Sequence, residues 1–163
     1  MKKMTCCLLL FVLSILPSFA QNNEPANNIG KSLSLMKQQF PELRYIETDS
    51  KGDKYEDGYQ QDGIAVFFYL KDNLVIEECM IIQSNDDFPR MWFDKMVDEF
   101  ISNYSPGFGV SNYNSKHWCY STFQVHLIYV SENRKNTALI VYEKGGYETG
   151  ITGKDFFEMY NSK

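Results

Sequence analysis

One amphipathic segment, residues 88–104, constrains the fold more than any other part of the chain. Asp86 and Asp87 precede it, where carboxylates can accept the N–H groups of a first helical turn. So wide a stripe of large apolar side chains cannot keep a helix stable by itself, and it needs a sheet to pack against. The side chains recur every three or four residues and therefore share one helical face: Trp92, Phe93, Met96, Val97, Phe100, Ile101 and Tyr104.

Strand-like segments flank this helix on both sides. Residues 64–70 and 74–83 are rich in apolar and β-branched side chains, and the intervening Lys71-Asp72-Asn73 predicts a tight hairpin turn. Residues 117–130 and 137–143 predict a second hairpin around the polar connector 131–136. The segment 49–63 is predicted to be a solvated loop, because its spacing of acidic residues and glycines does not match a calcium loop.

The remaining elements complete a simple order. Residues 29–40 predict a short helix with Ser32 as its N-cap, residues 43–48 a first strand, and the chain from Thr152 a last helix. The two halves look alike in outline, each a helix followed by strands, without a repeat of residues. We therefore expect an α+β fold, a mostly antiparallel sheet from two hairpins with helices packed on one face, forming a two-layer sandwich.

The N-terminus has the pattern of a signal peptide. Lys2 and Lys3 precede the apolar stretch 8–16, and Ser18-Phe19-Ala20 ends it with small residues where a signal peptidase cuts. We expect cleavage near Ala20 and export to the periplasm or the extracellular space. Residues 21–28 are predicted to be a disordered lead-in and residues 29–163 a single α+β domain. No second apolar stretch predicts stable membrane insertion after cleavage.

The net charge of the chain limits the classes of partner that it is expected to bind. The net charge is −5, and loss of two signal-peptide lysines lowers it to −7. Dispersed acidic charge argues against nucleic acid or an anionic membrane as partner. Two cysteines remain after cleavage, Cys79 and Cys119, and the sequence leaves open whether they form a disulfide or stay as buried thiols.

Residues that carry chemistry are few. His117 and His126 are separated by an odd number of positions on one predicted strand, which would place them on opposite faces. Cys119 and His126 are also separated by an odd number of positions, which would place them on opposite faces. His126 could then not act as the base for a Cys119 thiol nucleophile. Cysteine and histidine spacings match no zinc site, and the glycines of 145–153 do not match a phosphate loop. The sequence therefore predicts no catalytic residue, no metal site and no cofactor.

Aromatic residues are the remaining unusual feature, at 15% of the chain with eleven tyrosines. Those in predicted loops or at strand starts could form an exposed binding surface, although small domains also fill their cores with aromatic rings. The candidates for such a surface are Tyr55, Tyr59, Tyr113, Trp118 and Tyr120.

The stretch IGKSLSLMKQQFPEL, residues 29–43, resembles the opening of small exported bacterial domains built from helix-plus-hairpin units. SmpA-type outer-membrane assembly lipoproteins and β-lactamase-inhibitor-like folds begin in a similar way. The likeness covers these residues alone, and this chain lacks the lipidated cysteine of the lipoproteins. The resemblance implies a non-enzymatic role in binding or assembly and carries over no functional residue.

Three hypotheses about function follow. The first is a secreted or periplasmic non-enzymatic module that binds a protein, a carbohydrate or another macromolecule through an exposed sheet face or aromatic loops. The second is an enzyme without a recognisable motif, which a concave pocket holding His117 or His126 beside a carboxylate would favour. The third is a small-ligand carrier closed by the sheet and the helix at 88–104. The oligomeric state stays open.

Overall fold

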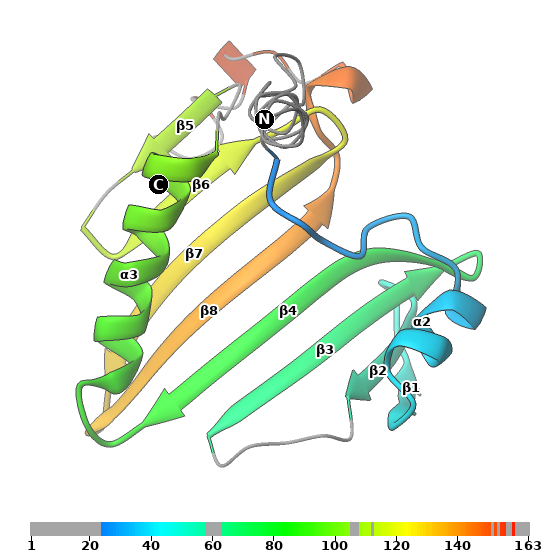
Figure 1. Ribbon diagram of the computed structural model, residues 1–163, viewed down its shortest axis with the longest axis horizontal. Coiled ribbons are helices and arrows are strands. Elements are labelled where there is room, and N and C mark those ends of the chain that lie inside the picture. Colours follow the sequence, from blue (N-terminus) through cyan, green and yellow to red (C-terminus); the bar gives the residue numbers. More distant parts are fainter. Residues whose placement is uncertain are drawn as a thin grey trace, which may run out of the picture.

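The computed structural model describes residues 24–57, 63–104, 108–111, 113–150, 152, 154, 155 and 158. Within them, eight strands form one antiparallel sheet in the order β1-β2-β3-β4-β8-β7-β6-β5 (Figure 1). The predicted signal peptide and Tyr59 lie outside these residues. The strands are β1 (Leu43–Thr48), β2 (Asp53–Asp57), β3 (Ile64–Lys71), β4 (Leu74–Ser84), β5 (Phe108–Ser111), β6 (Ser115–Cys119), β7 (Phe123–Glu132) and β8 (Lys135–Lys144).

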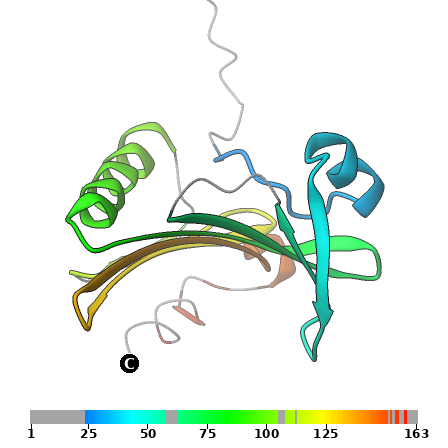
Figure 2. The same ribbon diagram turned by 90° about the horizontal axis from the view of Figure 1, so that it is seen from below.

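The two halves of the chain share one element order. The helix α2 (Leu33–Gln39) precedes β1 to β4, and the helix α3 (Phe88–Asn103) precedes β5 to β8. The last strands of the two halves, β4 and β8, pair over eight residue pairs and join the halves into one sheet. Both helices lie on the same side of the sheet (Figure 2). The predicted α+β class with an antiparallel sheet is confirmed.

Each helix covers its own part of the core. Under α3, Phe93, Val97 and Phe100 pack on side chains of β6, β7 and β8. Under α2, Met36 packs on Phe68 and the neighbouring strands. Partly buried side chains complete both clusters, and Ile29 contacts both of them.

Residues just before α2 and α3 determine where each helix begins. Asp86 accepts the backbone N–H of Phe88 at 3.0 Å, which lowers the pKa of the Asp86 carboxyl. Ser32 accepts the N–H of Leu35, as an N-cap should. The first helix begins four residues later than predicted, because Gly30 has a φ of +81° and its N–H donates to the Val75 carbonyl.

Tight turns at equivalent places close the hairpins β3–β4 and β7–β8. Asp72 and Asn73 in the first, and Asn133 and Arg134 in the second, all have positive φ. Two-residue turns with this geometry match the twist of antiparallel strands. The connector 131–136 was predicted to be longer than it is, since the strands continue almost to this turn.

The sequence reading predicted three strands too few, and one of those it missed is β5. The segment predicted to be a solvated loop contains β2, which pairs with β1 and β3 because Tyr55 at its centre packs into the cluster under α2. The segment 117–130, predicted to be one strand, belongs to two strands, with residues 120–122 turning the chain between β6 and β7. There, Tyr120 donates its N–H to the Phe123 carbonyl and stacks on the Phe123 ring.

Neighbouring residues of α3 give a direct test of this packing. Phe100 is 1% exposed and stacks on Trp118 with ring centroids 5.0 Å apart, whereas the adjacent Ile101 is 66% exposed. Phe100→Ala should therefore lower the free energy of unfolding by about 3–5 kcal/mol. Ile101→Ala should change it by less than about 0.5 kcal/mol. Urea unfolding measures both, and equal losses would contradict the placement of α3.

Candidate functional site

Alternation along the central strands gives the sheet two chemically different faces. On β4, Glu78 and Met80 point toward the helices, and Glu77 and Cys79 point away from them. We call these the helix face and the far face. Each face holds a candidate site. The first lies on the helix face, over the middle of the sheet, which neither α2 nor α3 covers.

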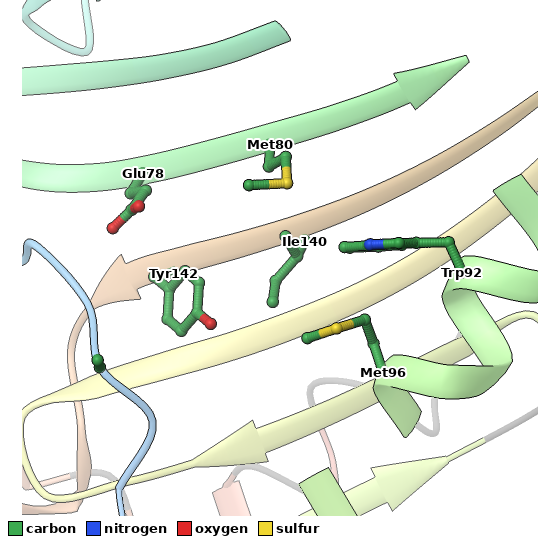
Figure 3. Close-up of a pocket in the computed structure, with 7 residues that line it drawn as sticks. Glu78, Met80, Trp92, Met96, Ile140 and Tyr142 are labelled. Atoms are coloured by element: carbon green, nitrogen blue, oxygen red, sulfur yellow. The ribbon is translucent and has the colours of Figure 1, made fainter. Parts of the chain in front are cut away.

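A cavity of about 330 Å³ lies on the helix face, between α3, the central strands and the segment 24–28. Figure 3 shows Trp92 and Met96 extending from α3 toward Met80 and Ile140 on the sheet, with Glu78 and Tyr142 at the other end. The apolar side chains therefore make the walls, the Glu78 carboxylate lies at one end, and the Tyr142 hydroxyl points away from it toward those walls.

The segment 24–28 borders this cavity. Glu24 accepts hydrogen bonds from the Ser121 backbone N–H and hydroxyl, both at 3.0 Å. Asn28 donates its backbone N–H to Glu78 Oε2 at 3.0 Å. These residues, expected to belong to a disordered lead-in, are thus tied to both halves of the sheet.

Glu78 is the charged group of the cavity. Burial raises the pKa of its carboxyl, against the lowering effect of the Asn28 hydrogen bond and of the Lys31 charge. Burial, and next the charge of Glu78, raise the pKa of the Tyr142 hydroxyl. Among the described residues, no lysine or arginine forms an ion pair with Glu78. The Glu78 carboxylate thus borders an apolar space, and Lys31, whose charge acts on it, is not in ion-pair contact with it.

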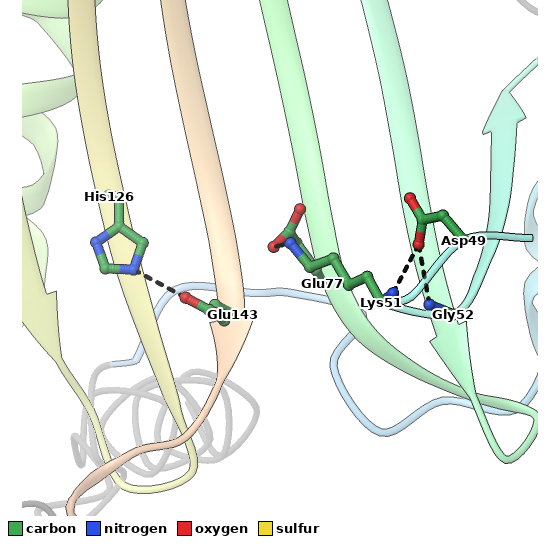
Figure 4. Close-up of polar contacts among 6 residues, drawn as sticks. All are labelled: Asp49, Lys51, Gly52, Glu77, His126 and Glu143. Carbon is green, nitrogen blue, oxygen red and sulfur yellow. Dashed lines mark hydrogen bonds and ion pairs between the residues drawn. The ribbon is translucent and has the colours of Figure 1, made fainter.

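The far face carries a row of charged side chains across the middle of the sheet (Figure 4). Asp49 accepts the N–H groups of Lys51 and Gly52, and this turn directs the Lys51 ammonium onto Glu77. Glu77 is paired with Glu143 on the next strand. Glu143 lies 3.6 Å from His126 Nε2, and this contact lowers the pKa of the Glu143 carboxyl.

The two histidines lie side by side, which corrects the prediction that they occupy opposite faces. His117 on β6 is paired with His126 on β7, and their Nδ1 atoms are 2.8 Å apart. One Nδ1 must donate and the other accept, so both imidazoles cannot be protonated at these atoms together. Burial and the His126 charge lower the pKa of His117 to about 4. The prediction failed because the turn between β6 and β7 was missed.

These histidines partly meet the criterion for an enzyme. His126 does lie beside the carboxylate of Glu143, but the described cavity is on the opposite face.

Neither cysteine is a favourable thiol nucleophile. Burial raises the pKa of Cys119, and burial with the charge of Glu77 raises that of Cys79 to about 11, so both thiols stay protonated near neutral pH.

Three of the five predicted binding residues are in the core. Tyr55, Trp118 and Tyr120 are 8%, 6% and 1% exposed, so the prediction that they form an exposed surface is wrong for them. Tyr55 was misplaced because the strand β2 was not recognised, and Trp118 and Tyr120 because the turn at 120–122 was not. Tyr113 is 78% exposed, and its ring lies 4.6 Å from the Arg90 guanidinium. Tyr59 lies outside the described residues.

The cavity and the histidine pair were not found from the sequence. The residues of the cavity come from segments far apart in the chain, and the histidine pair depends on the turn at 120–122, which has no local signal. The described residues hold no cluster of three or more His, Cys, Asp or Glu side chains arranged for a metal ion. Among the described helices, none combines the length and hydropathy that a membrane span requires.

Comparisons of the chain with protein-family models, with curated proteins and with solved structures returned no match.

Sheet order predicts that the cysteines stay reduced. Cys79 and Cys119 are free thiols on β4 and β6, which are separated by β8 and β7. Three strand spacings are about 14 Å, beyond the reach of a disulfide at about 7 Å. In the chain from Gln21 onward, two thiols should react with a disulfide reagent after unfolding without reductant and neither should react quickly in the native state. Cys79→Ser should leave one, and an absence of reactive thiols after unfolding would contradict this sheet order.

Acidification should destabilise the fold through His117. Its pKa of about 4 lies below its ordinary value of 6.5, so the unfolded chain takes up a proton that the folded imidazole refuses. Stability is therefore fully present above about pH 6.5 and falls as the pH drops toward 4. Urea unfolding of the wild type and of His117→Gln between pH 7 and 5 isolates the contribution of His117 to the pH dependence of stability. The variant should lose less stability on acidification, and identical pH profiles would rule the assignment out.

Proposed function

We propose that this protein is an exported, non-enzymatic binding module, a two-layer α+β sandwich that uses the far face of its sheet to bind a protein. The observation that carries the proposal is a band of apolar side chains on that face. All are half-buried except Val130, which is 38% exposed. The band consists of Phe67, Ile81, Ile128, Val130, Leu139 and Val141.

The size of the band suits a protein partner. It crosses the four central strands β3, β4, β8 and β7, about 20 Å at ordinary strand spacing, and its three rows of residues extend about 13 Å along them. This area, of the order of 260 Å², matches the apolar centre of a standard interface, in which one partner's share is about 800 Å². A small sugar would contact only a fraction of it.

The chemistry of the band also favours a protein over a carbohydrate. Sugars stack on exposed aromatic planes, but here lysines cover the two candidate rings. Lys54 lies 4.9 Å from the centre of the Phe67 ring and Lys51 lies 4.9 Å from that of Tyr69. The rest of the band is aliphatic. Since the exported chain would carry a net charge of −7, we expect the partner surface to be apolar at its centre and basic around it.

The proposal predicts where a partner can be crosslinked. A photo-crosslinking residue in place of Leu139 should yield a discrete adduct with another protein in the cells that make this one. The same residue in place of Met91, which is 67% exposed on α3, should not. Val130→Lys should weaken binding of the purified partner at least tenfold, because it places a charge in the band without disturbing the core.

Each alternative outcome is informative. Met91→Lys is the matched control, and its binding should equal that of the wild type. Adducts only between copies of this chain would assign the far face to self-association and overturn the proposal. Equal crosslinking from both positions, no adduct from Leu139, or unchanged binding by Val130→Lys would overturn it as well.

A further inference from the structure

We propose that the cavity on the helix face binds a small amphiphilic amine. The ammonium group would lie at Glu78, and the apolar body would lie between Trp92, Met80 and Met96. This inference concerns the face opposite the proposed protein-binding band and stands independently of it.

The position of the cavity follows from the fold. The helix α3 contacts β8, β7 and β4, while Met36 of α2 packs near Phe68 and Val75 at the other side of the sheet. Neither helix fills the space above the junction of β4 and β8. The segment 24–28 closes one side of this space, with Ala26 lining it.

The volume and the walls define the body of the ligand. About 330 Å³ corresponds to roughly eleven water-sized volumes, since a water occupies about 30 Å³ of liquid. That space suits an alkyl chain or a single aromatic system. Met80 and Met96 are flexible and polarizable and can adapt to an irregular apolar group. The indole of Trp92 adds a flat apolar wall.

The polar end defines the charge of the ligand. Glu78 Oε2 already accepts from Asn28, which leaves lone pairs of the carboxylate available toward the cavity. A cationic donor would offset the cost of burying this carboxylate, while an anion would add repulsion. A primary ammonium carries three donors, so it can donate to the Glu78 carboxylate. The Tyr142 hydroxyl points away from Glu78, toward the apolar side chains (Figure 3).

The charges around the cavity also favour a cation. Lys31, the nearby base, donates to Asn28 Oδ1 and Gln39 Oε1 and forms no ion pair with Glu78. Glu99 on α3 contributes with Glu78 to the raised pKa of Tyr142, so two carboxylates and the single Lys31 ammonium act at this end of the site, which leaves an excess of negative charge. A neutral ligand of the same shape would leave that excess uncompensated.

Octylamine is the probe for the test, with octanoate and 1-octanol as matched ligands of equal chain length. Calorimetric titration of the full chain at pH 7 should show saturable binding of octylamine. Octanoate should bind at least tenfold more weakly, and 1-octanol should fall between them. Trp92 indole resonances should shift in NMR spectra on addition of octylamine, and those of the buried Trp118 should shift less.

Variants assign the binding to the cavity. Glu78→Gln keeps an oxygen that accepts from Asn28 but removes the charge, and it should weaken octylamine binding at least tenfold. Trp92→Ala, which removes an apolar wall and keeps the charge of Glu78, should weaken it severalfold and provides a second variant if Glu78→Gln unfolds. Asp98→Asn removes the same charge from an exposed position of α3 and should leave the affinity unchanged.

Several results would overturn the proposal. These are an absence of saturable binding, equal affinity for octanoate or octanol, or equal effects of Glu78→Gln and Asp98→Asn. The far-face variant Val130→Lys should bind octylamine as the wild type does. A loss of octylamine binding by Glu78→Gln together with intact protein crosslinking would support this site separately from the proposed function.

Discussion

The pairing of β4 with β8 is the interaction on which the rest of the structure depends. Each half of the chain is a helix followed by a four-stranded antiparallel unit, and such a unit ends at an edge with free backbone groups. Joining the two inner edges over eight residue pairs satisfies both at once. It also separates the two helices, because each one packs on its own half. The cavity at the centre of the helix face is a direct result.

The same pairing places chemically different groups back to back. On β4 the adjacent Glu77 and Glu78 point to opposite faces, and so do Val141 and Tyr142 on β8. Glu77 is itself buried and has a cationic partner in the more exposed Lys51 ammonium. Glu78 meets a backbone N–H and an apolar cavity. Two carboxylates one residue apart thus differ in what they can bind.

The sequence was most informative where one strong pattern decided the structure. The helix α3 was predicted within one residue of its observed end, because its apolar stripe follows a helical period that the sheet then buries. The strands β3 and β4 were evident because a turn of Asp72 and Asn73 separates two apolar runs. These elements are determined by local patterns that tertiary contacts reinforce.

Prediction failed where tertiary contacts replaced local signals. The turn at residues 120–122 contains no glycine, proline, asparagine or aspartate, and it is held by stacking of Tyr120 on Phe123 and by Glu24 bonded to Ser121. Because this turn was not predicted, His117 and His126 were assigned to one strand and hence to opposite faces of the sheet. The strand β2 is mostly polar, and the single buried ring of Tyr55 fixes its orientation. Neither interaction has a signature at the level of spacing.

The alternation of faces lets the two proposed sites coexist in a small domain. Substitutions at Ile81 or Val130 project away from the cavity, and those at Glu78 or Tyr142 project away from the far face. The backbone of β4 and β8 is the element that the two sites share, and it lies in the middle of a continuous sheet. A ligand that fills the cavity would stiffen this junction without entering the protein-binding band. Communication between the sites would then require movement of the β4–β8 pair itself, the interaction that holds the two halves together.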